Sequence, residues 1–171
     1  VDLTILGDAA LPASTAAATY FAGRLAYTSG RPVLRLSSAA KAASVGTRIL
    51  IAWKESREAA CAVADAIPLL KQASFVALMQ VVEPAREIRD GLDALEKIVV
   101  HLRHFGIRAE RYVVQAPRFE TGREILAHAD RIDADLVVMG AYGHSPLDEA
   151  FLGGVTRSVL KHAQIPLFLS H

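Results

Sequence analysis

The sequence has few of the residues that form covalent, aromatic or metal sites. Its single cysteine, Cys61, cannot form an internal disulfide, and its position among alanines predicts a small buried side chain in a reducing compartment. Aromatic residues make up only 6% of the chain, which excludes the base-stacking surfaces of single-strand nucleic-acid binders. The P-loop motif and the G-x-G-x-x-G dinucleotide motif are both absent from the sequence.

An excess of charge and long apolar runs are missing as well. The chain has 19 Lys and Arg residues against 18 Asp and Glu residues, which excludes a strongly basic nucleic-acid binder. Its apolar runs fall short of the ~20 residues that cross a bilayer, and Val1–Leu6 does not resemble a secretory signal. We therefore expect a cytoplasmic protein without membrane or nucleic-acid contacts. The 171 residues, 52% of them hydrophobic, suffice for one packed domain or slightly more.

From residue 48 onward, apolar runs alternate with amphipathic stretches. The runs predict strands at Arg48–Trp53, Ser74–Val82, Arg108–Val114, Asp135–Met139 and Pro166–Leu169. The stretches between them predict helices at Ser56–Leu70, Asp90–Phe105, Thr121–Ile132 and Val155–His162. Alternating strands and helices form parallel βαβ units, and strands this rich in Val, Ile and Leu are covered on both faces. The predicted fold is α/β, a doubly wound open parallel five-stranded sheet.

Local signals mark where these helices begin and end. Ser56 is placed to cap the first helix, Gly106 closes the second, and Thr121–Glu124 has the spacing of a capping box. In the first helix, the residues expected to face the sheet are Ala60, Val63, Ala64, Ile67 and Leu70.

Residues 1–46 repeat the end of the chain. Val1–Gly7 (VDLTILG) matches Ala134–Gly140 (ADLVVMG), and Arg31–Ser37 (RPVLRLS) matches Ile165–His171 (IPLFLSH). Helical spacing over residues 13–29 separates the two matches. Residues 1–46 are therefore interpreted as the closing strand–helix–strand of a preceding degenerate repeat plus a linker, and residues 47–171 as a complete domain.

Such a strand–helix–strand unit cannot cover its own apolar faces. We expect it to pack on the complete domain, on another chain, or on an upstream half of the first repeat. The short apolar strands Val33–Leu36 and Pro166–Leu169 are expected at sheet edges, which invite pairing. The prediction is that they pair antiparallel, either inside one chain as a pseudo-dimer or between two copies as a homodimer.

A ligand site is expected where the strand order of the sheet reverses, beyond the carboxyl ends of the strands. Two loops meet that description: Lys54-Glu55-Ser56 and Gly140–Thr156. In the second loop, Gly140 and Gly143 permit close backbone approach, and Gly153-Gly154 lead into the last helix, whose free amides suit a phosphate. The alternative is that these glycines shape a turn and end a short helix.

The glycine spacing resembles that of a known family. Gly140-x-x-Gly143, nine residues and then Gly153, between ADLVVMG and IPLFLS, is similar to the ATP-binding signature of the universal stress protein family. The resemblance covers 47–171 in element order, and residues 1–46 resemble the end of the first half of a tandem member. It implies an adenine nucleotide alpha hydrolase-like fold and ATP or ADP, with Mg²⁺, as the ligand. The residues it places at the nucleotide are Ala52, Trp53, Lys54, Val82, Met139, Gly140, Gly143, Gly153, Gly154, Val155 and Thr156.

Two positions depart from the family pattern. Gly154 stands where the family usually has Ser or Thr, so a hydroxyl hydrogen bond of roughly 1 kcal/mol is lost. Lys54 stands where nucleotide binders tend to have Asp, and an ammonium cannot accept a hydrogen bond but can reach a phosphate. The partial copy has no glycine in Asp8–Ala18, so we expect no nucleotide there.

Three functions follow from these observations. The first is a stress-response module that binds ATP or ADP and acts as a sensor, with at most slow hydrolysis. The second is an interaction or dimerisation module whose nucleotide site has decayed, and the third is an adenylating or ligase-type enzyme. No catalytic set and no metal site is predicted. The weaker candidates are His101 and His104 for a metal, His144 for a phosphate, and Asp148-Glu149 for Mg²⁺ or as a base.

Overall fold

The computed structural model describes residues 2–7, 15–37, 44–84, 88–141 and 154–171, with the backbone alone for 15–20. In chain order the elements are β1 (Thr4–Gly7), α1 (Thr15–Ser29), β2 (Val33–Leu36), β3 (Arg48–Trp53), α2 (Arg57–Leu70), β4 (Phe75–Val82), α3 (Ile88–Arg103), β5 (Glu110–Gln115), a 3₁₀ turn (Arg118–Glu120), α4 (Thr121–Arg131), β6 (Leu136–Gly140), α5 (Gly154–His162) and β7 (Leu167–Ser170). The described parts of the chain contain no helix with the length and hydropathy needed to cross a bilayer.

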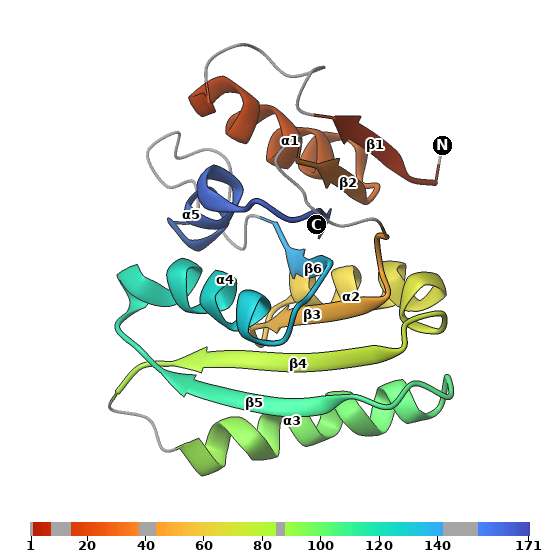
Figure 1. The fold of residues 1–171 in the computed structure, drawn as a ribbon, viewed down its shortest axis with the longest axis vertical. Coiled ribbons are helices and arrows are strands. Elements are labelled where there is room, and N and C mark those ends of the chain that lie inside the picture. The colour runs from red at the N-terminus through yellow and green to blue at the C-terminus, as the bar shows by residue number, and fades with distance from the viewer. Residues whose placement is uncertain (1, 8–14, 38–43, 85–87, 142–153) are drawn as a thin grey trace.

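The strands form one seven-stranded sheet in the order β1-β2-β7-β6-β3-β4-β5. The five strands from β7 to β5 are all parallel to their neighbours, which confirms the predicted five-stranded parallel sheet. The β1–α1–β2 segment extends this sheet, since β1 pairs parallel with β2 and β2 pairs antiparallel with β7. In Figure 1 the edge strands β1 and β5 lie at opposite ends of the molecule.

Helices cover both faces of the sheet, as a doubly wound fold requires. One core cluster joins buried residues of α2 and α3 to the sheet, and a second joins those of α1, α4 and α5 to its other face. On β3, Ile49 and Ile51 belong to the first cluster and Leu50 to the second, and each is at most 1% exposed. This burial on both faces explains why the strand sequences are apolar without alternation.

The antiparallel pair β2–β7 relates equivalent positions of the internal repeat. In the sequence match Leu34 corresponds to Phe168, and these two residues are register partners in the structure. On either side, Val33 pairs with Leu169 and Arg35 with Leu167, which is the reciprocal pattern of an interface with twofold symmetry. The predicted antiparallel pairing of these two segments is confirmed, and both partners belong to the same chain.

Two of the three predicted helix signals are confirmed. The Ser56 hydroxyl accepts the backbone amide of Ala59 at 3.3 Å, and Gly106 takes a positive φ of 78° after α3. The capping box at Thr121 is wrong. The 3₁₀ turn runs directly into α4, so the Thr121 amide donates to the Arg118 carbonyl and Thr121 is already helical.

The predicted inner face of α2 is partly wrong. Val63 and Leu70 are buried as expected, but Ala60 and Ala64 are exposed. The buried alanines are Ala59, Ala62 and Ala66. Because alanine occurs on nearly every side of this helix, the sequence period does not determine its rotation, and close packing against the sheet does.

Candidate functional site

The predicted site lies where the strand order reverses, between β3 and β6. The two strands are adjacent and parallel, and Ala52 pairs in register with Met139 near their carboxyl ends. After β3 the chain enters α2 on one face of the sheet, whereas α5 packs on the other face. Because the helices that follow these neighbouring strands pack on opposite faces, the carboxyl ends of the strands are the position at which open α/β sheets bind ligands.

The predicted residues of the strand ends differ in what they offer a ligand. Ala52 and Trp53 are half-buried and Lys54 is exposed, whereas Met139 is 5% exposed. Val82 ends β4 with a buried side chain, and its carbonyl already accepts the Ala116 amide at 3.0 Å. The structure thus places β3 and β6 residues side by side, while Val82 is engaged with the chain beyond β5.

Gly140 is explained by the close approach of another backbone. A Cβ at this position would lie 2.6 Å from the Ala59 nitrogen and 2.9 Å from the Glu58 Cβ. Only glycine therefore lets the first turn of α2 close onto the end of β6. This packing requirement exists with or without a ligand. It differs from both the turn-shaping and the phosphate-approach interpretations of this glycine.

The amino terminus of α5 begins at an exposed glycine. Gly154 is its first residue and is exposed, and a Cβ there would meet no described atom within 4 Å. Val155 is half-buried, and the Thr156 side chain is only 5% exposed, so its hydroxyl is not displayed at the surface. The first amides of a helix have no partner within the helix and carry its positive dipole end, which suits an anion. Gly143 and Gly153 lie outside the described residues.

Glu58 is a site candidate that the sequence reasoning missed. Burial raises the pKa of this carboxyl, but hydrogen bonds from its own backbone and from Ser56, together with the charges of His171 and Arg57, outweigh burial and lower the pKa overall. Its Cβ neighbours the Gly140 position at the end of β6. In sequence Glu58 is an ordinary first-turn acid, and only the topology brings it to this place.

His171 follows β7 at the end of the sheet, and its charge acts on Glu58. Its Nδ1 lies 2.8 Å from the Ala141 carbonyl, and its ring packs edge-on against Tyr27 of α1 with 4.7 Å between the centroids. The last residue of β7, Ser170, donates its hydroxyl to Asp65 of α2. These contacts fix the surroundings of the β6 and β7 ends.

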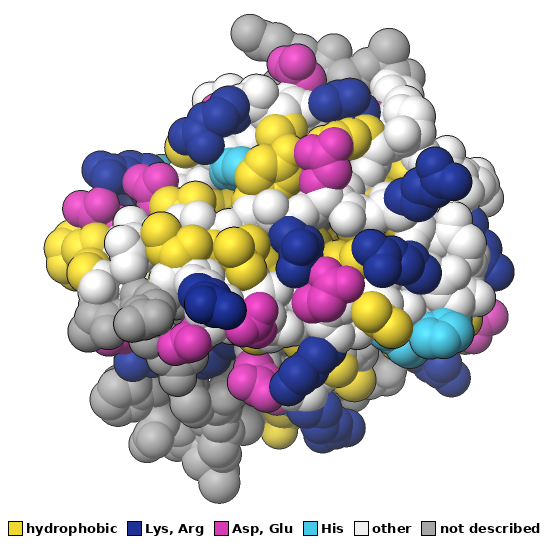
Figure 2. Space-filling view, turned by 90° about the horizontal axis from the view of Figure 1, so that it is seen from below, with side chains coloured by type: hydrophobic (Ala, Val, Ile, Leu, Met, Phe, Trp, Pro, Cys, Tyr) yellow, Lys and Arg dark blue, Asp and Glu magenta, His cyan; other side chains and the backbone are white. Residues whose placement is uncertain are grey.

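Of the remaining polar candidates, only His101 and His104 are among the described residues. His101 and His104 are exposed on α3 and in the turn after it, and the described residues contain no group of three acidic, histidine or cysteine side chains able to hold a metal. His144, Asp148 and Glu149 fall in a segment outside the described residues. On the face turned toward β5 and α3, Figure 2 shows both signs of charge intermingled with hydrophobic patches.

Comparison with known proteins identifies a family for most of the chain. The model of the universal stress protein family matches residues 46–171. Universal stress protein MJ0531 of Methanocaldococcus jannaschii is 29% identical over 80 residues, which cover 47% of this chain and 45% of that protein. The chain therefore matches less than half of the length of this relative.

Solved structures show the same fold. A universal stress protein from Archaeoglobus fulgidus has a TM-score of 0.74 at 20% identity, over 99% of this chain and 60% of that chain. The protein UspA from Lactobacillus plantarum has a TM-score of 0.63 at 16% identity, over 75% and 99%. A universal stress protein in complex with cAMP has a TM-score of 0.57 at 16% identity, over 72% and 96%. With a family model that covers well over half of its residues and a sheet of the same architecture, this chain belongs to the universal stress protein family.

Proposed function

We propose that the chain binds an adenine nucleotide, ATP or ADP, between the carboxyl ends of β3 and β6 and the amino terminus of α5, as a sensor or binding module in the stress response. The observation that carries the proposal is the exposed Gly154 at the start of α5, around which no described atom lies within 4 Å of a Cβ position. It belongs to the loop-and-helix segment that follows β6, one of the two strands at which the order of the sheet reverses.

Membership in the universal stress protein family supports this ligand class. One of the structurally similar proteins was solved in complex with cAMP, which is itself an adenine nucleotide. That protein shares only the fold with this chain, so the argument depends on the residues described above.

Each residue has a proposed role. The amides of Gly154, Val155 and Thr156 receive the phosphates, and the Lys54 ammonium supplies a positive charge beside them. Ala52 and Trp53 contact the base. Glu58 takes over the acceptor role that Lys54 cannot fill and binds the ribose hydroxyls. No protein set for Mg²⁺ is present among the described residues, so the ion enters this proposal only as a companion of the phosphates.

A pair of substitutions at one position tests the phosphate site. Gly154→Asp places a carboxylate at the helix terminus, where it suits the dipole of α5 but repels a phosphate, so ATP affinity should fall about 10-fold or more. Gly154→Ala is the matched control, because the added methyl group meets no described atom, and its affinity should stay within about 2-fold of the natural chain. Isothermal titration with ATP, ADP and adenosine, with and without Mg²⁺, measures both.

Equal ATP affinity of the Gly154→Asp and Gly154→Ala variants would show that the phosphates do not bind at the amino terminus of α5. Absence of binding to the unmodified chain at millimolar ATP would favour the second function, an interaction module with a decayed site. This second function is supported by Lys54, which stands where nucleotide binders of the family tend to have Asp.

We also propose that the assembly is an intramolecular pseudo-dimer. In the structure β7 has β6 on one side and β2 on the other, so neither of its edges is open to a second copy. The chain should therefore sediment as a monomer at micromolar concentration. A stable dimer that persists after charge is introduced at Leu34 would contradict this arrangement.

A further inference from the structure

The carboxyl end of β6 is fixed through its backbone before the chain continues toward α5. Ala141, the first residue after β6, is fully buried. Its amide donates to the Ser170 carbonyl at 2.7 Å, and its carbonyl lies 2.8 Å from Nδ1 of His171. Because a carbonyl oxygen can only accept, this ring nitrogen carries a proton and donates it. Both backbone groups of Ala141 are therefore bound by the last strand and the residue that follows it.

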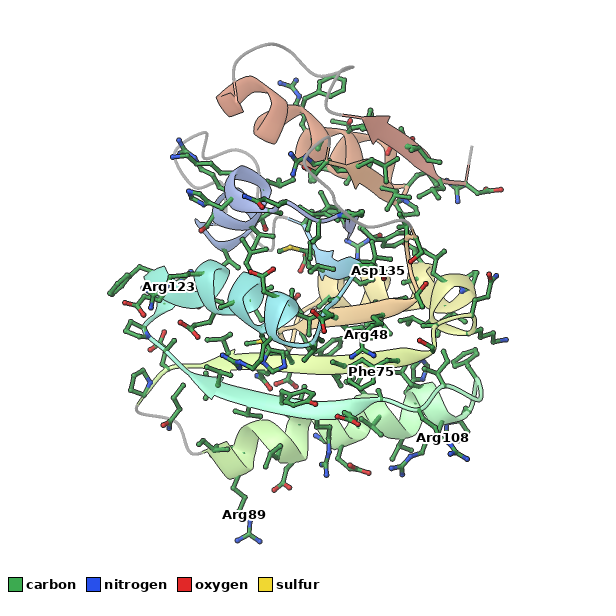
Figure 3. The ribbon with its side chains drawn as sticks, in the orientation of Figure 1. Arg48, Phe75, Arg89, Arg108, Arg123 and Asp135 are labelled. Carbon is green, nitrogen blue, oxygen red and sulfur yellow. The ribbon has the colours of Figure 1, made fainter. Side chains whose placement is uncertain are left out.

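The amino end of β6 is fixed by a side chain as well. The Asp135 carboxylate accepts backbone amides at the start of β3 at 2.9 or 3.0 Å, those of Gly46, Thr47 and Arg48. Asp135 and Arg48 come from neighbouring strands and lie close together (Figure 3). His171 has the corresponding role at the carboxyl end, where the proposed nucleotide site lies.

Tyr27 of α1 holds the ring of His171. The two rings meet edge-on, with 4.7 Å between their centroids and 72° between their planes. Aromatic rings favour this edge-to-face geometry. Since the imidazole pivots about the bonds of its side chain, the contact with Tyr27 limits the directions in which Nδ1 can point. A residue of the β1–α1–β2 segment thus contacts the side chain that binds Ala141.

The same junction is held from the other face of the sheet by α2. A Cβ at Gly140 would lie 2.6 Å from the Ala59 nitrogen, so the first turn of α2 leaves the end of β6 no room to shift toward it. The charge of His171 acts on Glu58 in this turn, the residue proposed to bind the ribose. Because α1 and α2 pack on opposite faces, the end of β6 is restrained from both.

The histidine belongs only to the copy of the repeat that has the glycine-bearing loop. In the sequence match His171 corresponds to Ser37, so the first copy has no imidazole at this position. The first copy instead supplies Tyr27, which packs on the imidazole of the second. The contact is therefore not a repeated feature of the fold, and it lies at the one end of the sheet where a ligand is proposed.

From these contacts we infer that Tyr27 and His171 are positioning residues of the nucleotide site. His171 holds the backbone at the end of β6 in the position that the nucleotide meets, and Tyr27 holds the imidazole. A site that is already in place spends less of its binding free energy on ordering the protein. The inference rests on the function proposed above and extends it, because it gives the β1–α1–β2 segment a part in the site of the complete domain.

Substitutions at His171 test the hydrogen bond to Ala141. The side-chain amide of asparagine places an N–H where Nδ1 is, whereas that of glutamine reaches the position of Nε2. ATP affinity of the full chain, measured by isothermal titration, should fall about 5-fold in His171→Gln, the equivalent of one lost hydrogen bond. In His171→Asn it should stay within about 2-fold of the natural chain, because the donor is kept.

Substitutions at Tyr27 test the support of the imidazole. Tyr27→Leu removes the edge-on contact, so ATP affinity should fall about 3-fold, whereas Tyr27→Phe keeps the ring and should preserve it. The matched control is His101 of α3, which meets Phe105 edge-on with 5.2 Å between the centroids. Because α3 packs on β4 and β5, His101→Gln should leave ATP affinity unchanged.

Hydrogen exchange gives a readout that needs no ligand. The Ala141 amide should exchange about 10-fold faster in His171→Gln and Tyr27→Leu than in the natural chain, and at the natural rate in His101→Gln. A contact that only stabilises the fold would instead speed the exchange of all core amides alike. It would also leave ATP affinity unchanged at a temperature where every variant is folded.

The outcomes separate this inference from the function on which it rests. No ATP binding by the unmodified chain at millimolar ligand would overturn the nucleotide function and this inference with it. Binding by the unmodified chain, with equal affinity in His171→Gln and Tyr27→Leu, would overturn the positioning role alone. An equal loss of affinity in His171→Asn and His171→Gln would also overturn it, because the hydrogen bond to Ala141 would not be the cause.

Discussion

The chain contains the same strand–helix–strand unit twice, and the two copies differ in their neighbours. In both copies the strands pair in parallel and the helix packs on the same face of the sheet, as β1–α1–β2 and as β6–α5–β7. Yet Val138 in the first strand of the second copy is fully buried, while the corresponding Ile5 of the first copy is 60% exposed. The comparison teaches that the repeated sequence determines the local form. Burial depends on what the rest of the chain places alongside.

The largest difference between the copies is expected at the paired acids. Asp135→Ala removes the acceptor of three backbone amides at the start of β3 and should lower the free energy of unfolding by roughly 3 kcal/mol or more. Asp2→Ala should change it by less than about 0.5 kcal/mol, because its side chain is fully exposed. Urea unfolding followed by the fluorescence of Trp53, the single tryptophan, measures both. An equal loss of unfolding free energy in the two variants would contradict the difference between the two copies.

The paired glycines should give a smaller difference of the same sign. Gly140→Ala forces a methyl group against the backbone of α2 and should destabilise the fold by about 1–3 kcal/mol. Gly7→Ala meets open space without a positive φ, so it should be neutral or slightly stabilising. Thermal unfolding of the two variants beside the natural chain provides the measurement. A neutral Gly140→Ala would show that α2 can withdraw from β6.

The smallest effect on stability is expected from His128, a residue of the complete domain that has no counterpart in residues 1–46. Burial, with the charge of Arg131 added, lowers the pKa of His128, whose ring packs 4.5 Å from that of Tyr112. The unfolded chain therefore takes up this proton first, and the stability linked to neutral His128 is present above about pH 6.5 and lost as the pH falls through the window below.

Urea midpoints at pH 7.5 and 5.5 measure this dependence. His128→Gln should make the fall in the urea midpoint between pH 7.5 and 5.5 smaller. His104→Gln, a change at an exposed position, should leave that fall unchanged. An unaltered decrease in His128→Gln would assign the pH dependence to other groups.

Much of this fold could be predicted from the sequence, because its strongest signals are local. The apolar run Arg48–Trp53 is β3 to the residue, and the Ser56 cap and Gly106 turn depend only on adjacent residues. Thr121 fails for a related reason, since the spacing of a capping box does not reveal a preceding 3₁₀ turn. The rotation of α2 could not be predicted because its alanines present no distinct apolar stripe.

The site was less predictable because its residues meet only through the topology. The sequence predicts Gly140 as a phosphate-binding glycine, whereas the atoms nearest to a Cβ at this position are backbone atoms of α2. Glu58 was overlooked because nothing in its local sequence connects it to β6. The glycine pair Gly143 and Gly153, which carried the family resemblance, lies outside the described residues and remains a prediction.

The pairing of Val33–Leu36 with the final strand has a consequence for the order of folding. During synthesis β2 leaves the ribosome well before its partner β7. Contacts this distant along a chain form late and slow its folding. The β2 strand therefore stays without this partner until β7 has been made. A chain that ends before Leu167 would lack β7, and the β1–β2 pair would then have no strand through which to join the sheet.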